Sequence, residues 1–230
     1  MAPPVDSALF DLDGCLYDMT NGLEEHVRSR IFEFMVARLG VEDVALAQQL
    51  WTVAFRRYNQ SLRGLRAAGY ALDTEEYWRF IRGDTARLLA PRPETTALVV
   101  ALVAAGVRCW VYTNCREREA VEALQALGIP LSLFAGVLGA DFQGGRCKPE
   151  LASFQRVLAH TGLDPHRCIM FEDSPKNLAT AKALGMRTIL VGSVTCAEER
   201  GPACLFDAQV ASCTLDEVRA AMPDLLPLGT

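Results

Sequence analysis

Short apolar runs alternate with longer amphipathic segments over most of the chain. The runs lack strict polar alternation and are rich in β-branched and aromatic residues, which is typical of strands buried on both faces. The segments between them show helical spacing, and two of them end on glycine, a usual stop signal. We expect strands at 5–10, 107–112, 136–139, 167–171 and 187–191, and helices at 94–105, 116–127, 150–161 and 174–184.

This alternation predicts an α/β protein with a mostly parallel sheet and helices on both of its faces. One stretch departs from it, because residues 20–90 contain no strand-like run and show helical spacing instead. We therefore expect a sheet-containing core domain formed by residues 1–19 and 91–230, and an inserted all-helical domain formed by residues 20–90. The last part of the core, residues 195–230, is expected to be a loop and one helix.

Three helices are expected within the inserted domain. The first begins with a candidate capping box formed by Asn21 and Glu24. The segment GLRAAGY, which follows the second helix, is expected to be a turn region. We expect the helices from Leu23 to a stop at Gly40, at about 43–58, and from about Asp73 to Leu89.

Composition and charge narrow the choice of partners. Of the 230 residues, 50% are hydrophobic and 22% are charged, as in an ordinary globular protein. The net charge of −5 argues against a nucleic-acid polymer as partner, since surfaces that bind one are usually basic. No apolar run approaches the ~18 residues that a membrane span needs, and no secretory signal is seen. We expect a cytoplasmic protein with free thiols, without a membrane partner, as a monomer or homodimer.

Polar and charged residues follow several of the predicted strands at their carboxyl ends. They are Asp11 and Asp13 after the first strand, Thr113 and Asn114 after the second, Glu172, Asp173 and Ser174 after the fourth, and Lys148 just before the helix at 150–161. Ligands of open parallel sheets bind outside these ends. We therefore expect carboxylates, a hydroxyl, an amide and an amine to gather at one edge.

These groups suit the chemistry of phosphate esters. Two carboxylates as close as Asp11 and Asp13 need a cation, a shared proton or much water. Mg²⁺ takes oxygen ligands, usually carboxylates together with a substrate phosphate, and Thr113, Asn114 and Lys148 offer donors to phosphate oxygens. One carboxylate can attack phosphorus, and the other can move a proton. Each feature alone also occurs in turns and helix caps, but their joint occurrence, in order, favours a functional site.

Four segments resemble, in order, the four motifs of the haloacid dehalogenase-like (HAD) hydrolase superfamily. They are FDLDGCLYD, YTN, CKPE and FEDSPKN. The likeness covers nearly the whole chain and includes a helical cap inserted between the first two motifs. It implies a Rossmann-like sheet and a cap that closes over the site during turnover. Two positions depart from the commoner pattern, since Glu172 stands where Asp is usual and Gly14-Cys15 where Asn-Thr or Asp-Thr is usual.

The resemblance also implies a role for each residue of the predicted site. Asp11 is the nucleophile, Asp13 the general acid/base, Thr113 and Asn114 bind the substrate phosphate, Lys148 holds nucleophile and phosphate together, and Mg²⁺ is bound by Asp11, Asp173, Glu172 and the backbone carbonyl of Asp13. Asp13 argues against the C–Cl dehalogenases, since a halide leaving group needs no proton. The inserted domain has no lysine, which argues against the phosphonatases.

We therefore expect a Mg²⁺-dependent phosphatase that hydrolyses a small phosphorylated metabolite through an aspartyl-phosphate. The segments around the motifs look most like the pyrimidine 5′-nucleotidase-like branch, which suggests a nucleoside monophosphate. A phosphotransferase of the mutase type and a non-catalytic scaffold stay as alternatives. Cap residues that could either bind the substrate or form cap core and solvated faces are Arg56, Arg57, Arg63, Arg66, Arg79, Arg82, Trp51, Phe55, Tyr58, Tyr77 and Trp78.

Overall fold

A six-stranded parallel sheet lies at the centre of the molecule. The computed structural model describes residues 4–192 and 206–226. Its strands are β1 (Ser7–Phe10), β2 (Arg108–Tyr112), β3 (Phe134–Leu138), β4 (Cys168–Glu172), β5 (Arg187–Val191) and β6 (Ala208–Val210). They follow the order β3-β2-β1-β4-β5-β6, and every neighbouring pair is parallel. This order confirms the expected Rossmann-like α/β fold. The strand order reverses between the neighbouring strands β1 and β4, which makes their carboxyl ends the switch point of the sheet.

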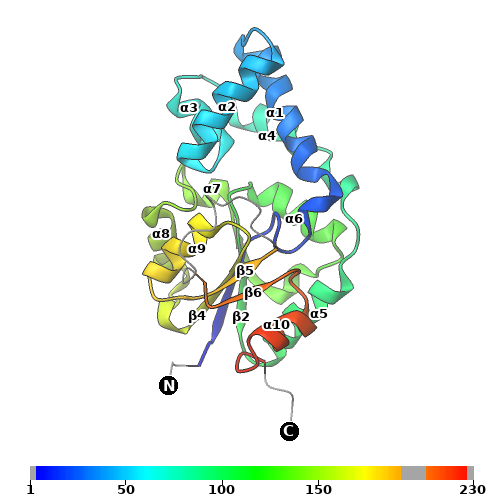
Figure 1. The fold of residues 1–230 in the computed structure, drawn as a ribbon, viewed down its shortest axis with the longest axis vertical. Coiled ribbons are helices and arrows are strands. Elements are labelled where there is room, and N and C mark those ends of the chain that lie inside the picture. Colours follow the sequence, from blue (N-terminus) through cyan, green and yellow to red (C-terminus); the bar gives the residue numbers. More distant parts are fainter. Residues whose placement is uncertain (1–3, 193–205, 227–230) are drawn as a thin grey trace.

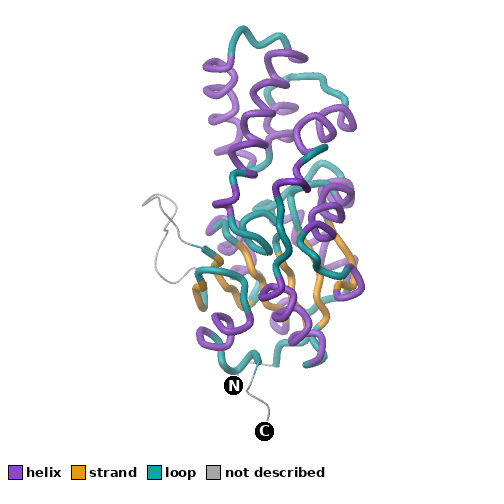
Figure 2. Tube along the Cα trace, turned by 90° about the vertical axis from the view of Figure 1, so that its right-hand side faces the viewer, coloured by secondary structure: helices purple, strands orange, loops and turns teal. Residues whose placement is uncertain are grey.

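Helices cover both faces of the sheet because its strands carry apolar side chains in alternating directions. Ala8 and Phe10 of β1 belong to one core cluster, and Leu9 belongs to the other. On the first face pack α5 (Pro93–Ala104), α6 (Glu117–Ala126) and α10 (Leu215–Ala221); on the second pack α8 (Leu151–Thr161) and α9 (Pro175–Ala183). Figure 1 shows the strands between α8 and α9 on the left and α5, α6 and α10 on the right. Figure 2, turned by 90°, shows the strands side by side across the lower part of the molecule. Short helical turns lie at α7 (Ala140–Gln143), Met19–Asn21, Thr85–Leu88, Leu131–Leu133 and Pro165–Arg167.

Four further helices form a cap over the carboxyl ends of the strands (Figure 1). They are α1 (Leu23–Leu39), α2 (Val44–Tyr58), α3 (Ser61–Ala67) and α4 (Thr74–Arg82). The cap has an aromatic core of its own, in which Phe34 makes edge contacts with Tyr77 at 5.2 Å and with Phe80 at 5.4 Å between ring centroids. The helical cap is as expected, while the division at residues 19/20 and 90/91 stays a prediction.

Several local predictions within the cap are wrong. GLRAAGY is not only a turn, because its first four residues belong to α3. A Cβ at Gly64 would lie 2.8 Å from the Ala54 Cβ, so this glycine allows α3 to pack against α2 rather than breaking the chain. The third expected helix ends at Arg82 instead of Leu89, and a separate short turn follows it. Only half of the capping box forms. Asn21 Oδ1 accepts a hydrogen bond from the Leu23 N–H at 2.9 Å, but Gly22 is the N-cap of α1 and Glu24 pairs with Arg28.

The core departs from the expectation in one strand. The sequence pattern of 195–230 does not predict β6. This strand has only three residues and pairs with β5 at the edge of the sheet, so it leaves little apolar pattern. Six cysteines are buried free thiols, as expected, and Cys196 and Cys204 lie outside the described residues. Among the described residues, no helix is both long and apolar enough to cross a membrane.

Candidate active site

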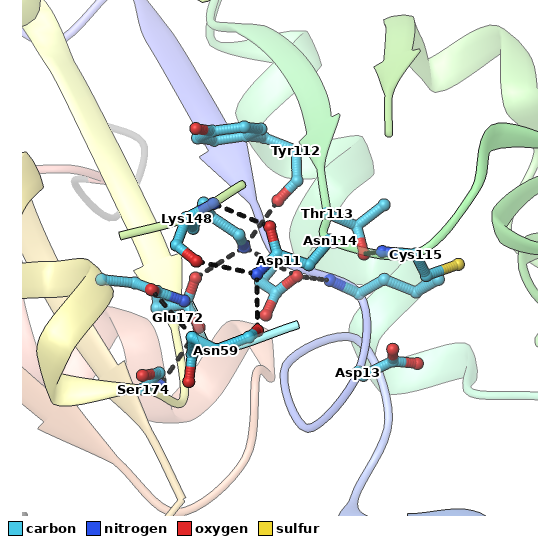
Figure 3. Close-up of polar contacts among 12 residues, drawn as sticks. Asp11, Asp13, Asn59, Tyr112, Thr113, Asn114, Cys115, Lys148, Glu172 and Ser174 are labelled. Carbon is cyan, nitrogen blue, oxygen red and sulfur yellow. Dashed lines mark hydrogen bonds and ion pairs between the residues drawn. The ribbon is translucent and has the colours of Figure 1, made fainter. Parts of the chain in front are cut away.

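Asp11, Lys148 and Glu172 form a buried ion cluster at the carboxyl edge of the sheet. Phe10 is in register with Val111 and Phe171 on the two neighbouring strands, which places Asp11 and Glu172 side by side, one residue further on. The Lys148 Nζ lies 2.9 Å from Asp11 Oδ1 and 2.7 Å from Glu172 Oε2. It also donates to the Tyr112 carbonyl at 2.8 Å, so its three protons are all used (Figure 3).

The electrostatics of this cluster keep Lys148 charged. Burial lowers the pKa of the Lys148 ammonium, but the charges of Asp11 and Glu172 outweigh it, so the pKa is raised above its usual range. Burial also raises the pKa of Asp11, and the neighbouring Glu172 charge raises it further against the opposing effect of Lys148. The pKa of Glu172 is likewise raised, chiefly by burial. The carboxylates therefore lack enough positive charge around them.

A divalent cation would supply the positive charge that this carboxylate cluster lacks. Asp11, Glu172 and Asp173 each offer one oxygen, and these oxygens all lie within 4.8 Å of one another. With Asp13 the site holds four carboxylates against the two cations Lys148 and Arg82, a balance of −2 when all are ionised. Burial and then the Asp11 charge raise the pKa of Asp173 to about 7. An all-oxygen donor set of this charge suits a hard ion such as Mg²⁺.

Gly14 allows the loop after β1 to pack directly on Asp173. Its φ is +77°, a conformation that favours glycine. A Cβ added at this position would lie 2.4 Å from Asp173 Oδ2 and 2.8 Å from Asp173 Cγ. Any side chain here must therefore displace the carboxylate.

We expect Gly14→Ala to weaken the response to Mg²⁺ and to lower activity about 10- to 100-fold, because groups that orient metal ligands have effects of this size. The measurement is the rate of phosphate release over a range of Mg²⁺ concentrations. Gly40→Ala is the matched control: Gly40 has φ +71°, but a Cβ there meets nothing within 4 Å. Both variants carry the strain of a left-handed alanine, about 1–2 kcal/mol. An equal Mg²⁺ response in the two variants would contradict the contact with Asp173.

Thr113 and Asn114 follow β2 beside this cluster, and their side chains are held differently. The Thr113 Oγ1 accepts a hydrogen bond from the Cys115 N–H at 3.1 Å, which leaves its own proton to donate. Asn114 Oδ1 accepts from the Lys148 N–H at 2.8 Å, and its Nδ2 donates to the Lys148 carbonyl at 3.0 Å. The Asn114 amide therefore holds the Lys148 backbone, and a phosphate contact from its side chain would compete with these bonds.

Asp13 lies apart from the metal cluster (Figure 3). Its carboxylate accepts hydrogen bonds from the Tyr17 hydroxyl and from both terminal nitrogens of Arg82 in the cap. Burial alone would raise the pKa of Asp13, but the charge and hydrogen bonds of Arg82, with that of Tyr17, lower it. Sequence reasoning assigned no role to Tyr17 and gave Arg82 no particular role, although Tyr17 lies within the first motif, FDLDGCLYD, four residues after Asp13.

A cavity of about 1240 Å³ lies between these residues and the cap. Of the cap residues singled out from the sequence, those that line it are Arg56, Arg82, Trp51, Phe55, Tyr77 and Trp78. Those that do not are Arg57, Arg63, Arg66, Arg79 and Tyr58. The loop between α2 and α3, which the sequence did not indicate, also reaches the site: Gln60 Nε2 donates to the Asn114 carbonyl at 2.7 Å, and the Asn59 carbonyl accepts from Asn114 Nδ2 at 3.1 Å.

Residues 5–185 match the haloacid dehalogenase-like hydrolase family. The chain belongs to this family. It is 31% identical over 196 residues to a phosphoglycolate phosphatase of Rhodospirillum rubrum, with 80% of this chain and 78% of the relative covered. The prediction of a haloacid dehalogenase-like hydrolase enzyme is therefore confirmed. The nucleotidase-like branch has no support from this relative and stays a prediction.

Solved structures share the whole fold, cap included. CbbY from Rhodobacter sphaeroides in complex with xylulose-(1,5)bisphosphate superposes with a TM-score of 0.68, at 23% identity, over 96% of this chain and 99% of CbbY. An L-2-haloacid dehalogenase from Xanthobacter autotrophicus gives a TM-score of 0.57, at 16% identity, over 95% and 99%. At these identities the likeness establishes the fold alone, so the chemistry has to be argued from the site.

Proposed function

We propose that the protein is a Mg²⁺-dependent phosphatase that hydrolyses a small phosphomonoester through an aspartyl-phosphate on Asp11. The observation that carries this proposal is the contact of Asp11 with Lys148, at 2.9 Å, within a cluster of carboxylates that lacks two positive charges. Asp11, Asp173, Glu172 and the backbone carbonyl of Asp13 would hold the ion. When bound, Mg²⁺ supplies charge that neutralises the carboxylates and the phosphate oxygens.

The side chains of this cluster support a two-step reaction. Asp11 Oδ1 accepts from the Leu12 N–H at 2.7 Å and from Lys148, which leaves Oδ2 to attack phosphorus. The bond to the leaving oxygen breaks, and Asp13, which has to enter this step protonated, gives that oxygen its proton. Water then attacks the phosphorus of the aspartyl-phosphate, Asp13 takes a proton from it, and Asp11 is regenerated. The Thr113 hydroxyl donates to a phosphoryl oxygen. Lys148 holds Asp11 in place, and it can contact the phosphoryl group only by giving up one of its bonds to Asp11, Glu172 or the Tyr112 carbonyl.

The comparisons support a small metabolite as the substrate. The Rhodospirillum rubrum relative is named for phosphoglycolate, and the CbbY structure holds xylulose-(1,5)bisphosphate. A nucleoside monophosphate is the second candidate, because two aromatic rings line the cavity. Trp51 and Phe55 stack at 4.7 Å between centroids with planes 21° apart, and a base could extend this stack.

We expect Mg²⁺ to be required for phosphate release and EDTA to abolish it. The experiment measures inorganic phosphate from phosphoglycolate, a sugar bisphosphate, a nucleoside monophosphate and p-nitrophenyl phosphate, each with Mg²⁺ and with EDTA. Restoration of activity by Mg²⁺ after EDTA treatment is the control for irreversible damage. Metal-independent release would contradict the assignment of Asp173. Consumption of ester without phosphate release would favour the phosphotransferase, and no reaction with any ester would favour the scaffold.

A further inference from the structure

Arg82 and Asp13 form an ion pair that joins the cap to the core inside the cavity. Arg82 is the last residue of α4, and its Nη1 donates to Asp13 Oδ1 at 3.0 Å while its Nη2 donates to Oδ2. The two side chains are only 12% and 23% exposed. The pair is therefore bidentate and largely withdrawn from water, which is the stronger class of charge-assisted contact.

This pair stands in the way of the proposed role of Asp13. The leaving oxygen of the substrate must accept a hydrogen bond from the protonated carboxyl group of Asp13 to receive its proton. One oxygen of Asp13 already accepts from Tyr17 and Arg82, and the other accepts from Arg82. Tyr17 is buried in the core at 2% exposure. The donor that gives way to the substrate is therefore Arg82, which belongs to the cap.

A guanidinium displaced from Asp13 needs another anion, because an unpaired charge in this environment is costly. Arg82 also has a donor to spare, since its buried Nε has no hydrogen-bond partner among the described residues. Arg28 has a buried Nε without a partner as well, but it pairs with Glu24 on its own helix rather than with Asp13, and Arg56 is exposed on α2. Arg82 is therefore the cavity arginine placed beside Asp13.

We propose that Arg82 exchanges partners: it moves away from Asp13 and binds a second anionic group that the substrate carries close to its ester oxygen. The group is a carboxylate or phosphate within a few bonds of that oxygen, because the oxygen must contact Asp13 and Arg82 already contacts Asp13. The exchange frees Asp13 for proton transfer, so such phosphomonoesters are preferred over uncharged ones. The inference rests on the proposed phosphatase function and names the substrate class of that site.

The first test is a ratio of kcat/KM for two esters that differ in the second anion, phosphoglycolate and ethyl phosphate. In the unmodified enzyme with Mg²⁺ we expect a ratio of about 10 to 100 in favour of phosphoglycolate, the range for hydrogen bonds to charged groups. Arg82→Gln should bring the ratio close to one, and Arg82→Lys should keep part of it. Arg79→Gln is the matched control, because Arg79 lies on the same helix, is exposed and does not line the cavity.

The outcomes separate this inference from the proposed function. A ratio near one in the unmodified enzyme, or an unchanged ratio in an Arg82→Gln variant that still releases phosphate, would overturn the role of Arg82 and leave the phosphatase intact. Release from neither ester, nor from any other phosphomonoester, would remove the phosphatase itself. A general structural role of Arg82 would lower both rates together and leave their ratio unchanged.

The second test measures the exchange without changing Arg82. The Asp13→Asn substitution removes the carboxylate that competes with the substrate for the Arg82 guanidinium. Phosphoglycolate should therefore bind about tenfold more tightly, relative to ethyl phosphate, than it does when Asp13 is present. Both affinities are measured by calorimetry in an Asp11→Asn background, which prevents turnover. Relief of charge repulsion alone also favours phosphoglycolate, because it carries one more negative charge than ethyl phosphate. The same comparison is therefore repeated with Arg82→Gln added. No relative gain for phosphoglycolate, or a relative gain that persists without the guanidinium, would overturn the exchange.

Discussion

Replacing Asp11 by asparagine is expected to lower phosphate release by on the order of 10³-fold or more, because the amide cannot form the covalent phosphoenzyme. The fold should survive the change. The amide oxygen can still accept from the Leu12 N–H and from Lys148, as Asp11 Oδ1 does now. The measurement is kcat with p-nitrophenyl phosphate at saturating Mg²⁺, together with the free energy of unfolding.

The stability of this variant has a predicted sign. Burial and the Glu172 charge raise the pKa of Asp11 in the folded state, so the ionised form lowers stability at pH values above the pKa of an unfolded aspartate. In EDTA at neutral pH, Asp11→Asn should therefore be at least as stable as the unmodified chain. Asp216→Asn, which changes an exposed carboxylate on α10, controls for contaminating phosphatases. Undiminished turnover in the Asp11 variant would remove this residue as the nucleophile.

The sequence predicts the edge of the sheet well because buried strands leave a strong signal. Residues 8–10 of β1 and 168–171 of β4 are continuous apolar runs, so the residues that follow these runs, Asp11 and Glu172, can be placed at strand ends without any structure. Parallel strands then bring those ends to one edge. Their adjacency needs the strand order, which the pattern of a single chain does not determine.

The contacts between cap and core lie beyond such reasoning. Arg82 is 69 residues from Asp13, and Gln60 is 54 residues from Asn114. Polar contacts over these separations have no period along the chain, whereas buried helices and strands do. The same holds for Gly64, where the pattern reads as a turn but the close approach of Ala54 decides the structure. Sequence reasoning therefore predicts the groups that the proposed chemistry uses, but not the residues that hold those groups in place.

Replacing Lys148 by methionine is expected to destabilise the protein by about 3–5 kcal/mol in EDTA, the usual result of removing one partner from a buried ion pair. Lys148 is fully buried, and it is the cation that contacts both Asp11 and Glu172. Methionine fills much of the same volume but leaves both carboxylates without their counter-charge. Urea unfolding measures the loss. Activity should also fall by about 10²- to 10³-fold, as when a group that stabilises transition-state charge is removed.

The charge explanation is separated from a packing explanation by a second substitution. Adding Glu172→Gln to Lys148→Met removes one of the two stranded carboxylates, so part of the lost stability should return while activity stays low. Lys182→Met is the matched control, because Lys182 pairs with Asp207 at side-chain exposures of 37% and 33%, and surface pairs contribute about 1 kcal/mol or less. If the double variant is no more stable than Lys148→Met, the cost lies in packing around the methionine. Lys148 would then not be the counter-charge on which the ionised nucleophile depends.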